Sequence, residues 1–109
     1  MPSKKFQVIW SKSAAFDLKS IVTFIAKDSP QNARDVLARI KRECKTLESF
    51  PDVGKVPAEL EALQIGGYRE LSISPWRVFY KKLLNQVFVV AVVDSRRDLE
   101  DALWNRLMR

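Results

Sequence analysis

The chain has 109 residues, of which 47% are hydrophobic and 29% charged, and its formal net charge is +6. These values exclude a low-complexity chain and predict one soluble domain over residues 1–109. The positive charge indicates an acidic partner, such as nucleic acid, an anionic membrane surface or an acidic protein. The simpler alternative is an excess of lysine that serves only solubility.

Histidine is absent, and cysteine occurs once, as Cys44. The missing histidine removes the commonest general base and metal ligand, so we expect no metal, and a Ser–His or Cys–His nucleophile is impossible within the chain. A single cysteine excludes an internal disulfide framework and fits a reducing cytosol. No apolar run is typical of a signal peptide or long enough for a membrane span. We therefore expect a cytoplasmic protein that does not enter a membrane and needs no cofactor.

The first part of the chain predicts a strand and then a helix. Phe6–Trp10 has the alternation of a strand. Ser11 or Ser13 can cap a helix that continues to about Lys27, with Asp17 in its early part, where the helix dipole favours an anion. The apolar stripe of this helix consists of Ala14, Leu18, Ile21, Val22 and Ile25, and Phe16 and Phe24 lie beside it.

A second helix follows after a short break. Ser29 is placed to act as its N-cap and Pro30 as its first residue, and the Phe50-Pro51 step ends it. Its apolar stripe consists of Ala33, Leu37, Ile40, Cys44 and Leu47. The short link between the two helices predicts an antiparallel helical hairpin. Cys44 lies in the stripe, so we interpret it as a small core residue.

Three β-type runs follow a long connection, Pro51–Gly67, that is either functional or a passive crossover. The runs are Tyr68–Ile73, Trp76–Lys82 and Val87–Val93, and turn-forming residues separate them. The last run is wholly apolar, so we expect it in mid-sheet with both faces covered.

After Arg97, apolar residues recur at helical spacing and leave Trp104 and Met108 off the stripe. The whole pattern predicts an α+β fold: an N-terminal strand, an antiparallel helical hairpin packed on an antiparallel sheet in the order β-α-α-β-β-β, and a C-terminal helix.

Arginines are the most informative residues of the second half. Arg69, Arg77 and the pair Arg96-Arg97 occur at corresponding places on neighbouring strands, so an antiparallel meander could gather them into one cationic patch. A guanidinium presents a planar donor fork that matches phosphate. Aromatic residues that occur nearby, such as Tyr80, add to the resemblance to a nucleic-acid surface. The alternative is that these are solvated charges, some of them paired with Glu70, Asp94 or Asp98.

Several segments, in their order and spacing, are similar to a known family. They are VIWSKSAAFDLKSIVTFIAKDSPQNA, LESFPDVGK, YREL, WRVFY and VVAVVDSRRD, and the resemblance extends over residues 8 to about 103. The chain resembles toxins of the RelE/ParE superfamily of bacterial type II toxin–antitoxin modules, and most of all the ParE branch. The resemblance implies a helical hairpin followed by an antiparallel sheet. It also implies a small, commonly acidic antitoxin whose C-terminal segment wraps the toxin, and through which the toxin can form an oligomer.

The function that the resemblance implies divides inside the superfamily. ParE-like toxins inhibit DNA gyrase, and for that function we expect Arg77, Arg96, Arg97 and Trp104 to bind the target without catalysis. RelE-like toxins are endoribonucleases that cut mRNA on the ribosome. In that alternative Arg69, Arg77 and Arg97 would clamp the scissile phosphate, and Tyr80 or a substrate hydroxyl would assist.

Two departures from the cutting branch favour gyrase as the target. Leu71 stands where a second lysine of the first meander strand would be expected, and Leu103 or Ala102 stands where a C-terminal tyrosine would be. Histidine, which often occurs near the C-terminus of that branch, is absent.

Overall fold

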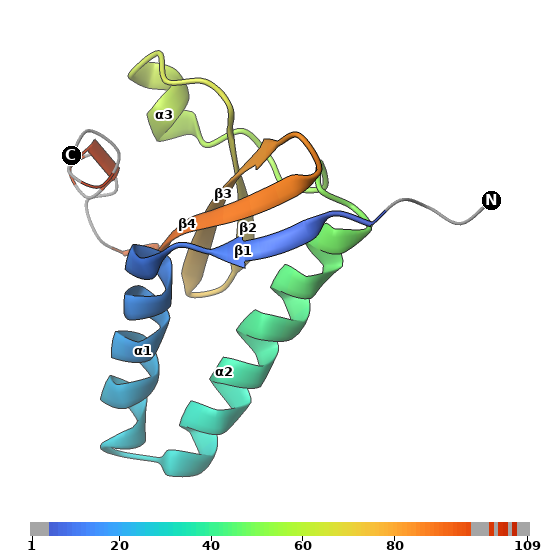
Figure 1. Cartoon of the computed structure of the whole chain (residues 1–109). Coiled ribbons are helices and arrows are strands. Elements are labelled where there is room, and N and C mark those ends of the chain that lie inside the picture. Colours follow the sequence, from blue (N-terminus) through green and yellow to red (C-terminus); the bar gives the residue numbers. More distant parts are fainter. Residues whose placement is uncertain (1–4, 97–100, 102, 105, 107–109) are drawn as a thin grey trace.

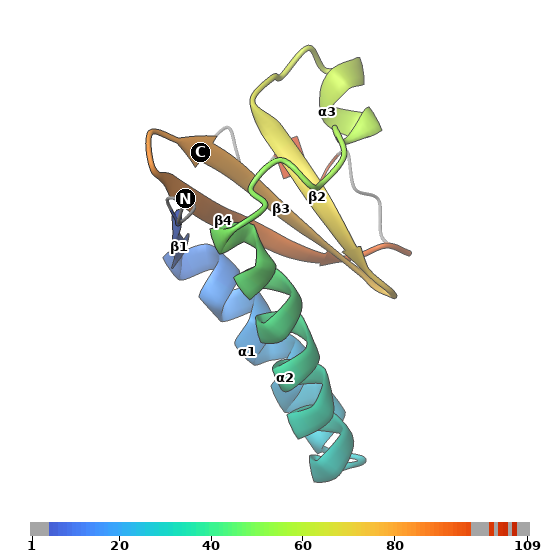
Figure 2. The same ribbon diagram turned by 90° about the vertical axis from the view of Figure 1, so that its right-hand side faces the viewer.

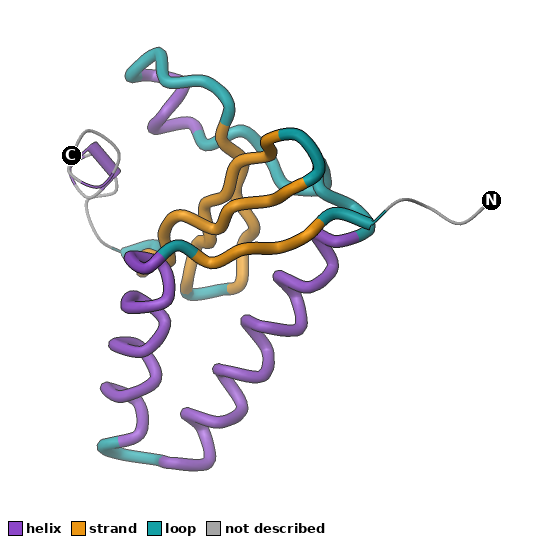
Figure 3. The backbone as a smooth tube through the Cα atoms, in the orientation of Figure 1, coloured by secondary structure: helices purple, strands orange, loops and turns teal. Residues whose placement is uncertain are grey.

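The chain has the α+β fold that the sequence predicts (Figures 1 and 3). The computed structural model describes residues 5–96, 101, 103, 104 and 106. The elements follow in the order β1 (Gln7–Trp10), α1 (Lys12–Ala26), α2 (Pro30–Lys45), η1 (Thr46–Glu48), α3 (Ala58–Ala62), β2 (Tyr68–Ile73), β3 (Trp76–Leu83) and β4 (Gln86–Asp94). The described residues beyond position 100 are all helical, which agrees with the predicted C-terminal helix. The other residues proposed for its stripe, and Met108, lie outside the described residues.

The four strands form one sheet in the order β1-β4-β3-β2. β2, β3 and β4 form the predicted antiparallel meander, with Ile73 opposite Trp76 and Leu83 opposite Gln86. The sequence predicts an antiparallel sheet throughout, whereas β1 pairs with β4 in parallel, so the sheet is mixed. Parallel neighbours need a long crossover, and the helices and the first two meander strands supply one. β4 is thereby central, as its apolar sequence indicates.

Serine caps fix where both long helices begin. The Ser11 side chain accepts a hydrogen bond from the backbone N–H of Ala14 at 3.0 Å, and Ser29 accepts one from Asn32 at 3.1 Å. Pro30 is the first residue of α2, as predicted. The two helices form a hairpin that packs on one side of the sheet and extends well beyond it, while α3 lies on the other side (Figures 1 and 2).

The main core lies between the helical hairpin and the sheet. Its buried residues are Ala14, Leu18, Ile40, Cys44, Leu47, Ile73, Val78, Tyr80, Val87, Val89 and Val92. The predicted stripe of α2 therefore faces the sheet. Burial raises the pKa of the Cys44 thiol to about 12, so this side chain is a core residue rather than a reactive thiolate. Within the described part of the chain, no helix is long and apolar enough to cross a membrane.

A second, smaller core covers the opposite face of the sheet. It consists of Leu60, Phe79, Ala91, Val93 and Leu103. Leu60 belongs to α3 and Leu103 to the C-terminal helix, so these two elements cover the second face of β4. The expectation that Val87–Val93 is covered on both faces is confirmed.

Candidate binding surfaces

Arg77 lies within an ionic cluster on the second face of the sheet. Its Nη1 and Nη2 atoms donate to the two carboxylate oxygens of Glu59 at 2.7 and 2.8 Å. Its Nε atom donates to Glu70 at 3.1 and 3.2 Å, and Nη2 makes a further short contact with the same carboxylate. Lys55 reaches Glu70 from solvent at 3.7 Å. The predicted pairing of an arginine with Glu70 is therefore present, and Glu59 is an additional partner.

The cluster leaves the Arg77 guanidinium little freedom to bind anything else. Only 16% of its side chain is exposed, and most of its N–H donors are taken by the two carboxylates. The hydrogen bonds from Arg77 lower the pKa of Glu59, and the same contact raises the pKa of Arg77. Arg77 therefore links β3 to β2 and α3, and the carboxylates of Glu59 and Glu70 balance its charge.

Arg69 and Tyr80 hold the long connection against the sheet. The Tyr80 hydroxyl accepts a hydrogen bond from the backbone N–H of Gly54 at 2.9 Å, and Arg69 donates to the Gly54 carbonyl at 2.7 Å. A Cβ atom at Gly54 would lie 2.5 Å from the backbone oxygen of Glu70, so only glycine fits there. Lys55 and Glu70 also form an isolated antiparallel bridge. The connection is therefore packed along the outer edge of β2.

Tyr80 is fully buried, and burial raises the pKa of its hydroxyl, which stays protonated near neutral pH. Burial and the hydrogen bond with Gly54 are typical of a residue with a structural role.

Two described members of the predicted cationic patch, Arg69 and Arg77, do not lie together, because the strand register separates them. Arg69 is paired with Tyr80 across β2 and β3, whereas Arg77 is paired with Ser72. Cross-strand partners share a face and side chains alternate along a strand, so Arg69 and Arg77 project from opposite faces of the sheet. The expectation that the meander gathers them is wrong.

Arg96 is the most exposed of the described members of the predicted group. Its side chain is 77% exposed, and it folds back onto Asp94 with contacts of 2.9 Å from Nε and 2.6 Å from Nη2. This pairing with Asp94 is one that the sequence suggested. Arg97 lies outside the described residues.

Arg96 borders an apolar groove between α1 and the end of β4. The groove has a volume of about 430 Å³, and its lining includes Phe16, Phe24, Ile21 and Trp76. Phe16 and Phe24 are 69% and 70% exposed, although they are large apolar residues. The signal in the sequence was their position beside the predicted stripe of α1, where they widen the apolar face without being needed by the core.

The C-terminal helix is tied to the same region by Asp17 and Arg106. The Asp17 carboxylate accepts two hydrogen bonds from Arg106, at 2.8 and 2.9 Å, and one from the backbone N–H of Val92 at 3.0 Å. Arg106 also donates to the Val90 carbonyl at 3.2 Å. Sequence analysis gave Asp17 a role at the helix dipole and missed this contact, because no local pattern links positions 89 residues apart.

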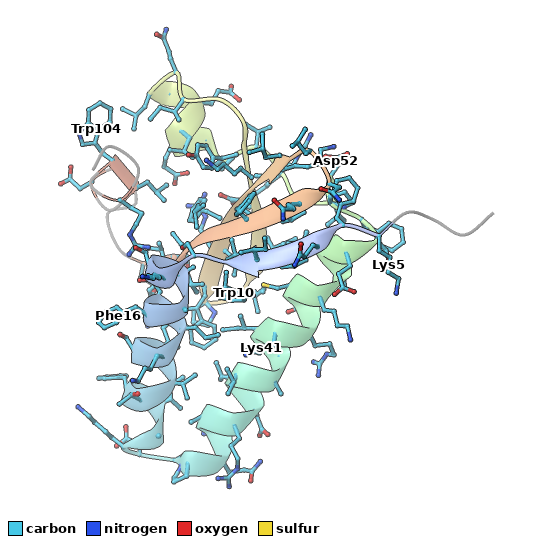
Figure 4. The ribbon with its side chains drawn as sticks, in the orientation of Figure 1. Lys5, Trp10, Phe16, Lys41, Asp52 and Trp104 are labelled. Atoms are coloured by element: carbon cyan, nitrogen blue, oxygen red, sulfur yellow. The ribbon has the colours of Figure 1, made fainter. Side chains whose placement is uncertain are left out.

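The contact between Asp17 and Arg106 positions the C-terminal helix, which also carries Trp104. Its side chain is 46% exposed, as its place off the predicted stripe indicates. Figure 4 shows Trp104 and Phe16 on the same side of the molecule. Phe16, Phe24 and Arg96 line one groove, and we call these three residues together with Trp104 the aromatic surface.

Comparison with known proteins identifies what the chain is similar to. Residues 8–99 match the family model described as ParE toxin of type II toxin-antitoxin system, parDE. Among solved structures, the chain is similar to one titled "Chromosomal ParDE TA system from P. aeruginosa". The match has a TM-score of 0.69 and 18% sequence identity, and it covers 84% of this chain and 98% of that one. At this identity the structural match shows the fold. No curated protein matches the sequence.

Proposed function

This chain belongs to the ParE toxin family of type II toxin–antitoxin systems, and we propose that it arrests growth by binding DNA gyrase in the cytoplasm. In this proposal the toxin catalyses nothing itself, and a cognate antitoxin holds it inactive. The observation that carries the proposal is the state of Arg77, whose guanidinium is enclosed by Glu59 and Glu70.

The arrangement of the candidate catalytic residues supports binding over RNA cleavage. A clamp on a scissile phosphate needs cations that converge on one point. Arg69 and Arg77 project from opposite faces of the sheet, and both donate hydrogen bonds to other groups of the protein. Tyr80 is buried and bonded to Gly54. These residues would have to rearrange before they could assist a ribosome-dependent cut.

The aromatic surface is our proposed contact with gyrase. Exposed aromatic side chains and arginines are the residue types that contribute most to protein–protein binding. Phe16 and Phe24 are exposed on α1, and Arg96 lines the same groove. We add Arg97 because it follows Arg96 directly, and we leave out Arg77 because its donors are taken.

The test is inhibition of DNA supercoiling by purified gyrase, with this protein titrated in. Wild-type protein should inhibit supercoiling, and Phe16→Glu or Arg96→Glu should raise the concentration needed at least about tenfold, as expected for central contacts of an interface. Phe50→Glu is the matched control because Phe50 is 65% exposed and lies outside the aromatic surface. It should inhibit as wild type does.

Two results would overturn the proposal. One is a folded wild-type protein that leaves gyrase fully active. The other is inhibition that Phe16→Glu and Phe50→Glu weaken equally. Cleavage of ribosome-bound mRNA by the same preparation, lost in Arg77→Ala, would replace the proposal with the endoribonuclease alternative.

A further inference from the structure

Four exposed apolar side chains belong neither to the aromatic surface nor to either core. Leu84 is 86% exposed, Phe50 65%, Val53 61% and Leu83 56%. None of them is among the residues of the two cores or of the groove beside Phe16. Single exposed apolar residues are common on protein surfaces, but several in one place mark a binding surface.

An ion pair brings the two segments that carry these side chains to one end of the sheet. Lys82, near the end of β3, lies 3.1 Å from the Asp52 carboxylate of the long connection. Its ammonium group also lies 5.7 Å from the centre of the Phe6 ring. Figure 4 shows Lys5 and Asp52 at this end, on the opposite side of the view from Phe16. We call the resulting patch the apolar end, and it consists of Phe50, Val53, Leu83 and Leu84.

Leu84 has a backbone conformation that does not suit its side chain. Its φ is 57°, a left-handed value that glycine or asparagine adopts at lower cost. It is the first residue of the two-residue connection between β3 and β4, in which Leu83 pairs with Gln86. Glycine is favoured where such a connection needs a positive φ. A leucine here strains the backbone and exposes apolar surface, so a binding role explains it better than folding does.

Lysines surround the apolar end on both faces of the sheet. Lys81 and Lys82 are neighbours in β3, so their side chains project from opposite faces. Lys5 adds a third ammonium group, and it is exposed. The carboxylates of Asp52 and Glu48 belong to the same end and offset only part of this positive charge.

We propose that the apolar end binds reversibly to an anionic lipid surface, with Leu83 and Leu84 inserted among the headgroups. Apolar side chains with cations around them are the arrangement by which proteins lie on a membrane without spanning it. Lysine side chains on both faces of the hairpin can reach phosphates on either side of the inserted tip. A fluid lipid surface fits better than an acidic protein, because the cations surround the tip instead of lying on one side of it.

This proposal departs from the expectation that the protein does not enter a membrane. That expectation depended on the length of apolar runs in the sequence, which reveals only spans and signal peptides. The residues of the apolar end come from two separate segments, Phe50–Val53 and Leu83-Leu84, and therefore form no such run.

The test is co-sedimentation of the purified full chain with lipid vesicles. Wild type should bind vesicles of phosphatidylcholine mixed with phosphatidylglycerol at least about tenfold more tightly than vesicles of phosphatidylcholine alone, because each lysine is attracted to the anionic headgroups. Leu83→Ser/Leu84→Ser should bind the mixed vesicles about tenfold or more weakly than wild type, because two inserted side chains are lost.

The matched control removes two exposed apolar side chains from the aromatic surface. Phe16 and Phe24 are as exposed as the residues of the apolar end, so Phe16→Ser/Phe24→Ser makes a similar change in exposed apolar area. It should bind the mixed vesicles as wild type does. Leu83→Ser/Leu84→Ser should in turn inhibit gyrase as wild type does in a lipid-free assay, which also shows that this variant is folded.

Leu84→Gly separates a binding role from a structural one. Its binding to the mixed vesicles should be about threefold or more weaker, because one inserted side chain is lost. Its midpoint of urea denaturation should rise, because glycine adopts a positive φ without strain. A variant that is less stable than wild type and binds equally well would show that Leu84 serves the fold.

Three further results would overturn the proposal. The first is a wild-type protein that stays in the supernatant with both kinds of vesicle, which would leave an acidic protein as the partner of the apolar end. The second is equal binding to the two kinds of vesicle. The third is an equal loss of binding in the two double serine variants, since any exposed apolar side chain would then suffice. None of these results bears on gyrase, so either proposal can fail while the other stands.

Discussion

The two faces of the sheet are covered by different chemistry. On the face toward α1 and α2, a continuous set of apolar side chains forms the main core. On the face toward α3 and the C-terminal helix, a smaller apolar core is accompanied by the ionic contact of Arg77 with Glu59. A second ionic contact joins Arg106 of the C-terminal helix to Asp17 of α1, which packs on the first face. The first face is stabilised mainly by buried apolar surface, and the second depends more on a few directed ionic contacts.

The difference follows from the length of the covering elements. α2 has 16 residues and can direct a whole apolar stripe at the sheet. α3 has five residues and contributes one buried side chain, Leu60. A helix of that length is not stable by itself and buries little apolar surface. The bidentate contact between Glu59 and Arg77 supplies a fixed orientation that packing alone would not give it.

The largest expected effect tests the apolar face. Ile40→Ala, at a fully buried position of α2, should lower the free energy of unfolding by about 3–5 kcal/mol, through lost burial and a cavity in a rigid region. Leu60→Ala, equally buried but on α3, should cost about 2 kcal/mol because the short helix can shift to fill the space. Urea denaturation of both variants measures the difference. Equal losses would mean that both faces are equally rigid.

A smaller effect tests the ionic face. Arg77→Ala should lower the free energy of unfolding by about 2–4 kcal/mol, because it leaves the Glu70 carboxylate, which is 1% exposed, without its main partner. Arg77→Met/Glu70→Met removes both charges and should recover to within about 1 kcal/mol of wild type. A double variant as unstable as the single one would show that the contact, and not the isolated charge, is what matters.

The difference between the two faces also explains which of their features the sequence predicts. The apolar face is periodic, and spacing alone predicts the five residues of the stripe. Ala33, Ile40, Cys44 and Leu47 are buried, and Leu37 is partly buried. Spacing predicts burial here because side chains three or four residues apart lie on the same face of a long helix. The ionic face has no repeat. Glu59 lies 18 residues from Arg77, on a connection whose path no local pattern determines.

One error about the arginines was avoidable. Ile73 and Trp76 are paired across the two-residue Ser74-Pro75 connection, and this pairing fixes which residues of the two strands face each other. Counting from it places Arg69 opposite Tyr80 and Arg77 opposite Ser72, on different faces. The Asp17–Arg106 contact, in contrast, depends on how the C-terminal helix docks, which the sequence alone does not determine.

The smallest expected effect concerns the charge of Glu59. Arg77 donates to this carboxylate and lowers its pKa below the ordinary value of 4.5, so the pair stabilises the fold above that value and loses its effect as the pH falls through the lowered pKa. Glu59→Gln should therefore be less stable than wild type near neutral pH, by about 1 kcal/mol or less for a partly exposed pair. The difference should shrink as the pH falls below 4.5 and through the lowered pKa of Glu59.

Urea denaturation of wild type and Glu59→Gln across this pH range measures the effect, and Glu61→Gln, at an exposed position of the same short helix, is the matched control. A gap that stays constant from neutral to acidic pH would show that the hydrogen-bond geometry at residue 59, rather than its charge, holds α3 to the sheet. In that case the face toward α3 would depend on the geometry of the contact at residue 59 and not on its charge.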